Sequence, residues 1–373
     1  METTSFDTDL SLFKYDHLEQ LPTAYRDLEE AEREERITAA KEALGDDVVI
    51  LGHNYQRREI VEHADFIGDS YQLSKHAAEA DAPYVVFGGV TFMAESADII
   101  TDDDQTVILP SMEASCPMAG MAEALQVDVA WAEITGATDA DIIPITYMNS
   151  YADLKAFCAD QGGLVCTSSN AHRAFEWAFE RGDKVLFLPD KHLGENTAYR
   201  LGMEDDIVAW DPWDAESKDP EKVAEHDIIL WEGYCQVHER FREQHIEDVR
   251  ADHPDAQVVV HPECRREVVE AADVVGSTST ICETVADADP GETWAIGTEI
   301  HLAEHLARWH PEVNVLPLCG DACMDCNAMR QIDPNYLTWV LEELVEGRER
   351  NVIEVAPEEK ELAQVALDRM LEV

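Results

Sequence analysis

Three cysteines near the C-terminus form the densest group of residues that could do chemistry. Cys319, Cys323 and Cys326 lie within eight residues, in a C-x3-C-x2-C spacing. Soft thiolates this close together are typical of metal or redox sites, and no His or Cys follows nearby to complete a four-ligand zinc site. An iron–sulfur cluster fits the set better. Radical S-adenosylmethionine enzymes share the spacing but carry it early in the chain, so that interpretation stays an alternative.

Two further cysteines, Cys116 and Cys235, follow predicted strands that match the strand preceding the C-terminal trio. The chain has nine cysteines, an odd number, and its composition is that of an intracellular protein, so a disulfide scaffold is not expected. One cysteine from each of three strand ends would form a three-thiolate site. Three thiolates on a [4Fe–4S] cluster leave one iron open, and such an iron is a Lewis acid that eases the loss of water.

Side chains suited to proton transfer and anion binding lie at other predicted strand ends. His, Tyr and Glu can exchange protons near neutral pH once their environments tune them. The candidates of this kind, with one Asn, are His53, Tyr55, Tyr147, Asn149, His238, His261 and Glu263. Hydroxyls at helix starts either cap the helix or bind phosphate and carboxylate; these are Ser70, Ser168, Ser169, Ser277 and Thr278. No dinucleotide or P-loop motif is present.

The elements that must position these residues recur three times in the same order. Four kinds of strand-bearing block repeat, at 47–56, 141–150 and 257–264; at 66–74, 164–172 and 274–281; at 84–92, 184–194 and 293–301; and at 106–116, 227–235 and 314–323. Their strands are continuous aliphatic runs, as in parallel sheets covered on both faces. Helices are predicted between them, at 150–160, 172–181 and 237–253 among others.

The alternation predicts an α/β protein with three similar α/β/α domains, each with a short parallel sheet, around a pseudo-threefold axis. A single doubly wound sheet is the alternative. The expected parts are a helical extension (1–45), domain 1 (46–120, completed by C-terminal helices of 331–373), domain 2 (121–237) and domain 3 (238–330). Because ligands bind beyond the carboxyl ends of parallel strands, the polar strand ends should meet in one cavity.

Local signals place two further features. An insertion rich in Asp and Pro at 210–225 is expected to be a loop of the second domain. Asp333 can cap a helix that has Pro334 at its first position and Gly347 as its stop.

The charge balance restricts the partners. Lys and Arg total 27 against 79 Asp and Glu, a net charge of −52. Such a field repels phosphate backbones and anionic membranes, so neither nucleic acid nor a membrane surface is an expected partner. The first residues lack the pattern of a signal peptide and no apolar run is long enough to cross a membrane, so we expect a cytoplasmic protein. Acidic residues spread along the whole chain indicate the salt-rich cytosol of an extreme halophile.

The motifs in order resemble those of quinolinate synthase, an enzyme of de novo NAD biosynthesis. The resemblance spans about 45–330 and rests on GHNYQ, GDSYQLS, FGGVTFMAE, SCPMAG, YMNSYADLK, TSSNA, LPDKHLG, WEGYCQVHE, HPEC, GSTST and CMDCNAM. It implies three pseudo-symmetric α/β domains around a [4Fe–4S] cluster with an open iron. It also implies condensation of iminoaspartate with dihydroxyacetone phosphate to quinolinate, with release of phosphate and two waters. An L-aspartate oxidase or aspartate dehydrogenase would supply the iminoaspartate.

Position by position, the resemblance implies Cys116, Cys235 and Cys326 as cluster ligands. The implied catalytic residues are His53, Tyr55, Tyr147, His238, His261 and Glu263, with Glu263 and a Tyr as acid and base. The implied substrate-binding residues are Ser70, Asn149, Ser168 or Ser169, Ser277 and Thr278, together with His53, Tyr147, His261 and Glu263. The x3 spacing between Cys319 and Cys323 departs from the family's x2, so no role is carried over to Cys319. These two cysteines are close enough for a redox-sensitive disulfide.

Two other classes remain open on the sequence alone. One is an iron–sulfur hydro-lyase that uses the same open iron on a different hydroxy acid. The other is a cluster-bearing sensor without turnover.

Overall fold

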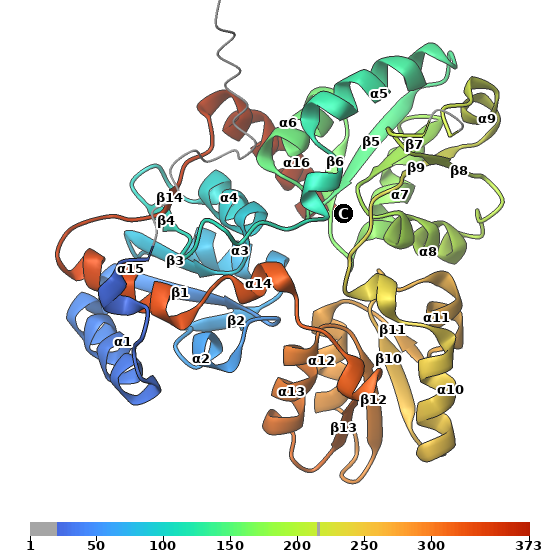
Figure 1. Cartoon of the computed structure of the whole chain (residues 1–373). Helices are drawn as coiled ribbons and strands as arrows, with labels where there is room; N and C mark the ends of the chain where they lie inside the picture. Colours follow the sequence, from blue (N-terminus) through green and yellow to red (C-terminus); the bar gives the residue numbers. More distant parts are fainter. Residues whose placement is uncertain (1–20, 215–216) are drawn as a thin grey trace, which may run out of the picture.

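Three separate β-sheets form the framework of the described residues, 21–214 and 217–373 of a computed structural model. The first sheet has the order β14-β4-β3-β1-β2, the second β6-β5-β7-β9-β8, and the third β11-β10-β12-β13. Figure 1 shows them as three lobes around a centre. The α/β class predicted from the sequence is confirmed, and the alternative of one large sheet is wrong. Residues 1–20 of the expected extension, and with them the start of the chain, lie outside the described residues.

The strands of the first sheet are β1 (Val48–His53), β2 (Phe66–Gly68), β3 (Tyr84–Gly88), β4 (Thr106–Ile108) and β14 (Val352–Ile353). Those of the second are β5 (Ile142–Tyr147), β6 (Leu164–Cys166), β7 (Lys184–Leu188), β8 (Ile207–Trp210) and β9 (Ile228–Trp231). Those of the third are β10 (Gln257–Val260), β11 (Val274–Val275), β12 (Thr293–Gly297) and β13 (Asn314–Pro317).

Each sheet contains the same four-strand unit. In chain order within a unit, the second strand lies beside the first, the first beside the third, and the third beside the fourth, and every one of these pairs is parallel. β8 and β14 are additions outside the fourth strand, and β14 runs antiparallel to β4. The four repeated sequence blocks are therefore the four strands of each unit. Parallel pairing brings the carboxyl ends of these strands to one edge of each sheet.

Helices separate the strands and cover the sheets (Figure 1). They are α1 (Glu30–Leu44), α2 (Arg58–Val61), α3 (Ser70–Glu79), α4 (Thr91–Ile100), α5 (Ala124–Gly136), α6 (Ala152–Asp160), α7 (Ala171–Phe179), α8 (Lys191–Leu201), α9 (Pro220–Glu225), α10 (Glu243–Asp252), α11 (Arg266–Ala271), α12 (Thr278–Ala286), α13 (Ile300–Trp309), α14 (Asn327–Arg330), α15 (Pro334–Val345) and α16 (Pro357–Glu372). Among the described residues no helix is both long and apolar enough to span a membrane.

The strands are aliphatic because they are buried in the core. All six residues of β1 and of β5 are buried, as are all four of β9, because helices cover both faces of each sheet. The largest apolar cluster runs through the first two lobes and takes in residues of α15 and α16, whereas the third lobe has two clusters of its own. α15 packs on α1, and α16 packs on α6 and β6. The C-terminal segment thus contacts both the first and the second lobe. The domain boundaries stay a prediction.

Two helix expectations need correction. The segment 210–225 is not all loop, because Asp219 accepts a hydrogen bond from the Glu221 N–H and, with Pro220 at the first position, starts α9. The segment 237–253 is not one helix: a 3-10 turn (His238–Arg240) ends at Phe241, whose backbone is extended, before α10 begins. The predicted cap at Asp333 is confirmed, since its side chain accepts from the Asn335 N–H at the start of α15.

Candidate active site

One cavity is lined by residues from all three sheets. The predicted residues that line it are His53, Tyr55, Ser70, Cys116, Tyr147, Asn149, Ser168, Cys235, His238, His261, Glu263, Thr278 and Cys326. Two predicted residues do not line it. Ser169 lies in the turn before α7, and Ser277 caps α12 by accepting from the Thr280 N–H. The carboxyl ends of the parallel strands therefore meet as expected, but two of the predicted hydroxyls do not line the cavity.

Two histidines at equivalent strand ends adopt the same local turn. Nδ1 of His53 accepts from the Tyr55 N–H at 3.1 Å, and Nδ1 of His261 accepts from the Glu263 N–H at 3.3 Å. An accepting Nδ1 carries no proton, so both rings are neutral. Burial also disfavours the charged ring, lowering the pKa of His53 to about 4 and that of His261 to about 3. Each turn then places Tyr55 or Glu263 in the cavity.

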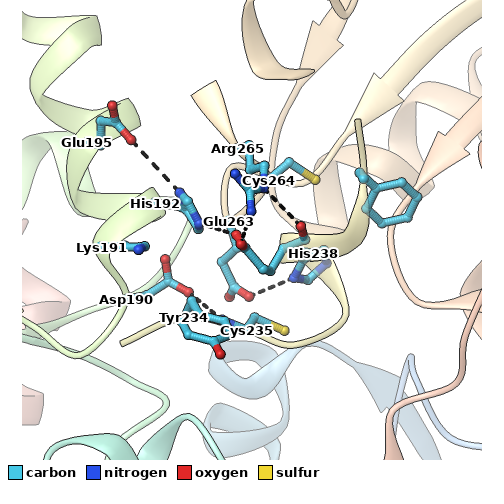
Figure 2. Close-up of polar contacts among 12 residues, drawn as sticks. Asp190, Lys191, His192, Glu195, Tyr234, Cys235, His238, Glu263, Cys264 and Arg265 are labelled. Atoms are coloured by element: carbon cyan, nitrogen blue, oxygen red, sulfur yellow. Dashed lines mark hydrogen bonds and ion pairs between the residues drawn. The ribbon is translucent and has the colours of Figure 1, made fainter. Parts of the chain in front are cut away.

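A chain of hydrogen bonds links the lobes through this cavity. His238 Nδ1 lies 2.7 Å from Glu263 Oε2, and His238 Nε2 lies 2.9 Å from Thr298 Oγ1 (Figure 2 shows the first contact). The hydroxyl of Tyr55 lies 2.6 Å from the same Thr298 oxygen. Because an ionised carboxylate only accepts, Nδ1 donates to Glu263; in a neutral His238 ring, Nε2 accepts from Thr298, which accepts from Tyr55. Tyr147 also donates to Glu263.

The electrostatics give the members of this chain opposite roles. Burial by itself would raise the pKa of Glu263, but attraction to the rings of His238 and His261, and then the hydrogen bonds from His238 and Tyr147, outweigh it and lower that pKa to about 2. Burial, and then the charge of Glu263, raise the pKa values of Tyr55 and Tyr147 well above the ordinary value. At neutral pH the carboxylate is the proton acceptor of the cavity, and the two phenols are donors.

Three thiols converge from the three sheets. Cys116, Cys235 and Cys326 each follow the fourth strand of their unit, and all three line this cavity as well as a second one that Arg240 and Met324 also line. Burial raises the pKa of Cys116 to about 12 and that of Cys326 to about 11. Three soft donors that come from three lobes and line the same two cavities fit a shared iron–sulfur cluster. Ligand atoms of Cys235, His238 and Glu263 lie within 4.8 Å of one another, so such a cluster would be close to the hydrogen-bonded chain.

The C-terminal trio divides into a pair and a single thiol. Cys319 and Cys323 form a disulfide, as the sequence allowed, and Cys326 is free. The trio is therefore not arranged as one three-thiolate motif, which removes the support for a radical S-adenosylmethionine site. Of the other free cysteines, Cys158 and Cys166 are buried core residues that do not line the cavity.

Four residues of the site were missed by the sequence analysis. They are Asp69, which accepts from Ser279 Oγ at 2.6 Å, Asp190, Thr298 and Glu299. The last three follow the third strand of their units. That block was noted as a strand with a polar turn but was not searched for functional residues. The signal that could have found them was the repeat itself, since the other three strand ends all carry candidates.

Comparison with known proteins agrees with this geometry. A sequence profile of the family described as Quinolinate synthetase A protein matches residues 35–372. The chain is similar to a quinolinate synthase of Haloarcula marismortui (83% identity over 374 residues, all of both chains) and to one of Halobacterium salinarum (82%, with the same coverage). It is also similar to a quinolinate synthase of Acidobacterium capsulatum (51% over 355 residues, 94% of this chain and 95% of that protein). The first two sources are halophiles, as the net charge of −52 predicts for this chain.

Proposed function

The chain belongs to the quinolinate synthase family, and from this premise we propose that it condenses iminoaspartate with dihydroxyacetone phosphate to quinolinate in NAD biosynthesis. Phosphate and two waters leave. The observation that carries the proposal is the meeting of three thiols with the Tyr55–Thr298–His238–Glu263 chain at one cavity. Condensation and dehydration need repeated proton transfer, and this cavity holds an ionised carboxylate beside protonated phenols.

Cys116, Cys235 and Cys326 are the residues that would hold a [4Fe–4S] cluster. With three protein ligands, the bound cluster supplies one open iron as a Lewis acid for a substrate oxygen. The chain's own residues then divide the proton transfers. Glu263 accepts a proton from the reacting carbon, and His238 holds its carboxylate in place. Tyr147, which is hydrogen-bonded to Glu263, is a donor for a leaving hydroxyl.

Neutral donors at helix starts are suited to the anionic parts of the substrates. Ser70 is the first residue of α3, Thr278 is the first residue of α12, and Ser168 lies in the turn before α7. All three line the cavity. A helix N-terminus offers free N–H groups and the positive end of the helix dipole, which favour phosphate and carboxylate. The N-terminal ends of these three helices therefore attract anions into the cavity, although the chain as a whole is strongly negative.

The test is anaerobic purification with iron and sulfide counting, followed by a quinolinate assay with iminoaspartate and dihydroxyacetone phosphate. We expect about four irons per chain, as in a cubane cluster, and quinolinate as product. Turnover of another hydroxy acid without quinolinate would favour the hydro-lyase. A full cluster without any turnover would favour a sensor. An L-aspartate oxidase or aspartate dehydrogenase that makes iminoaspartate in the assay is the proposed functional partner.

A further inference from the structure

Two buried carboxylates occupy the same position in the second and third sheets. Asp190 follows β7 and caps α8, and Glu299 follows β12 and caps α13. Both side chains are fully buried. One oxygen of each serves the cap: Asp190 Oδ1 accepts from the Leu193 N–H at 2.8 Å, and Glu299 Oε2 accepts from the His301 N–H at 2.7 Å. These two hydrogen bonds are ordinary helix capping.

The other oxygen of each carboxylate holds the backbone of a cysteine. Asp190 Oδ2 accepts from the Cys235 N–H at 3.2 Å (Figure 2), and Glu299 Oε1 accepts from the Cys326 N–H at 3.0 Å. In both lobes the end of the third strand thus supports the cysteine that follows the fourth strand. Neither cysteine lies inside a helix or strand, so no regular ladder of hydrogen bonds fixes its backbone.

The equivalent helix of the first sheet, α4, has no capping carboxylate. The residue at the N-cap of α4 is Val90, which has no capping side chain, and the helix forms without one. The loop before Cys116 is held differently: the N–H and the hydroxyl of Thr91 both donate to the Ala114 carbonyl, at 2.9 and 3.1 Å. All three cysteine loops are therefore tied to the end of the neighbouring third strand, but only two of them by a carboxylate.

We propose that Asp190 and Glu299 are positioning residues that orient Cys235 and Cys326 so that both sulfur atoms face the shared centre. The inference rests on the proposed three-thiolate cluster. A carboxyl group is required because two backbone N–H donors converge on one side chain, one on each of its oxygens. A serine offers one oxygen, and an amide would point its NH₂ group at one of the two N–H groups. Groups that orient the ligands of a metal commonly change its affinity by about 10- to 100-fold when they are removed.

The test uses Asp190→Ser and Glu299→Ser. Serine still caps a helix but cannot also reach the cysteine N–H. The matched control is Asp333→Ser, which makes the same change at the cap of α15, where the side chain accepts from the Asn335 N–H and from no cysteine. Asp190→Asn and Glu299→Gln keep the native shape, and they serve if a serine variant fails to fold.

After anaerobic reconstitution, we expect the site variants to release iron to a chelator on the order of tenfold faster than the wild type. We also expect a changed electron paramagnetic resonance spectrum of the reduced cluster, which a loss of helix capping alone would not produce. Asp333→Ser should match the wild type in both measurements. Wild-type release rates and spectra in all four site variants would overturn the proposal.

Hydrogen exchange of the cluster-free chain separates this inference from the proposed function. The amides of Cys235 and Cys326 should exchange faster in the corresponding serine variant and at the wild-type rate in Asp333→Ser. If the wild type binds no iron, the proposed function fails, and exchange still decides whether the carboxylates hold the two cysteines. Unchanged exchange would overturn the positioning role whatever the iron content.

Discussion

His238 Nδ1 and Glu263 Oε2 lie 2.7 Å apart with both side chains buried, although the two residues follow strands of different sheets. His238 comes after β9 of the second sheet, and Glu263 follows β10 of the third. The contact joins the turn that follows β9 to the turn that follows β10. It fixes Glu263 as an ionised acceptor, and Thr298 extends it to Tyr55 in the first lobe.

Replacing Glu263 by Gln should keep the cluster but remove most quinolinate formation. The amide keeps the shape of the carboxylate but cannot take up a proton, and loss of a general base costs on the order of 10²-fold or more in rate. The measurement is anaerobic turnover together with iron content. Glu270→Gln, at a surface ion pair with Arg266, is the control that should leave turnover unchanged. Normal turnover by a Glu263→Gln enzyme with a full cluster would contradict the role.

Thr298→Val should lower turnover by about tenfold or more, and Thr298→Ser should restore most of it. Valine keeps the shape of threonine but removes the hydroxyl that bonds to both Tyr55 and His238, leaving two buried polar groups without that partner. Serine keeps the hydroxyl. Both variants are to be compared in kcat and in iron content. Equal activity of the two would show that the hydroxyl link plays no part in the reaction.

Among the C-terminal cysteines, only Cys326 should be needed for the cluster. Cys319 and Cys323 are paired with each other, whereas Cys326 lines the cavity with Cys116 and Cys235. Three Cys→Ser variants are to be reconstituted anaerobically and counted for iron. We expect loss of iron in Cys326→Ser and retention in the other two. Retention of four irons and activity in Cys326→Ser would show that the assignment is wrong, and equal loss in all three would place the whole trio on one cluster.

Acid should remove stability that depends on the neutral ring of His53. Its pKa is lowered by burial to about 4 in the folded state, against about 6.5 in an unfolded chain. The unfolded state therefore binds the proton first as pH falls, so this contribution is complete above about pH 6.5 and is lost between there and pH 4. His53→Gln should have a shallower fall in Tm from pH 7.5 to 5 than the wild type.

The same comparison needs a control because low pH also neutralises many acidic groups. His253→Gln, which changes an exposed histidine, should keep the wild-type slope in the same high-salt buffer. Parallel slopes for His53→Gln and the wild type would contradict the prediction.

The folded state should require high salt. A net charge of −52 gives strong self-repulsion at low ionic strength, and salt shortens the screening length to about 3 Å at 1 M. Tm measured by circular dichroism should rise steeply from dilute buffer to about 2 M KCl, well into the screened regime. A Tm that does not change across this range would show that surface repulsion does not limit stability.

The sequence by itself determined the class of the fold and most of the site. Local patterns decide which segments become strands and helices. In this chain they are the aliphatic strands, helix caps such as Asp333, and the four kinds of block that each occur three times. Because parallel strands align their carboxyl ends, the repeat also predicted that His53, Tyr147 and Glu263 would share one cavity, which they do.

Only the tertiary structure decided which way each side chain points and what it touches. Ser277 caps its own helix, while the neighbouring Thr278 lines the cavity. Asp190 caps its own helix with one oxygen, and its second oxygen accepts from the N–H of Cys235, 45 residues away, because β7 and β9 lie side by side. The Tyr55–Thr298 bond spans 243 residues and joins two lobes. Contacts of this kind depend on how whole lobes pack together, and no local periodicity of the chain encodes that orientation.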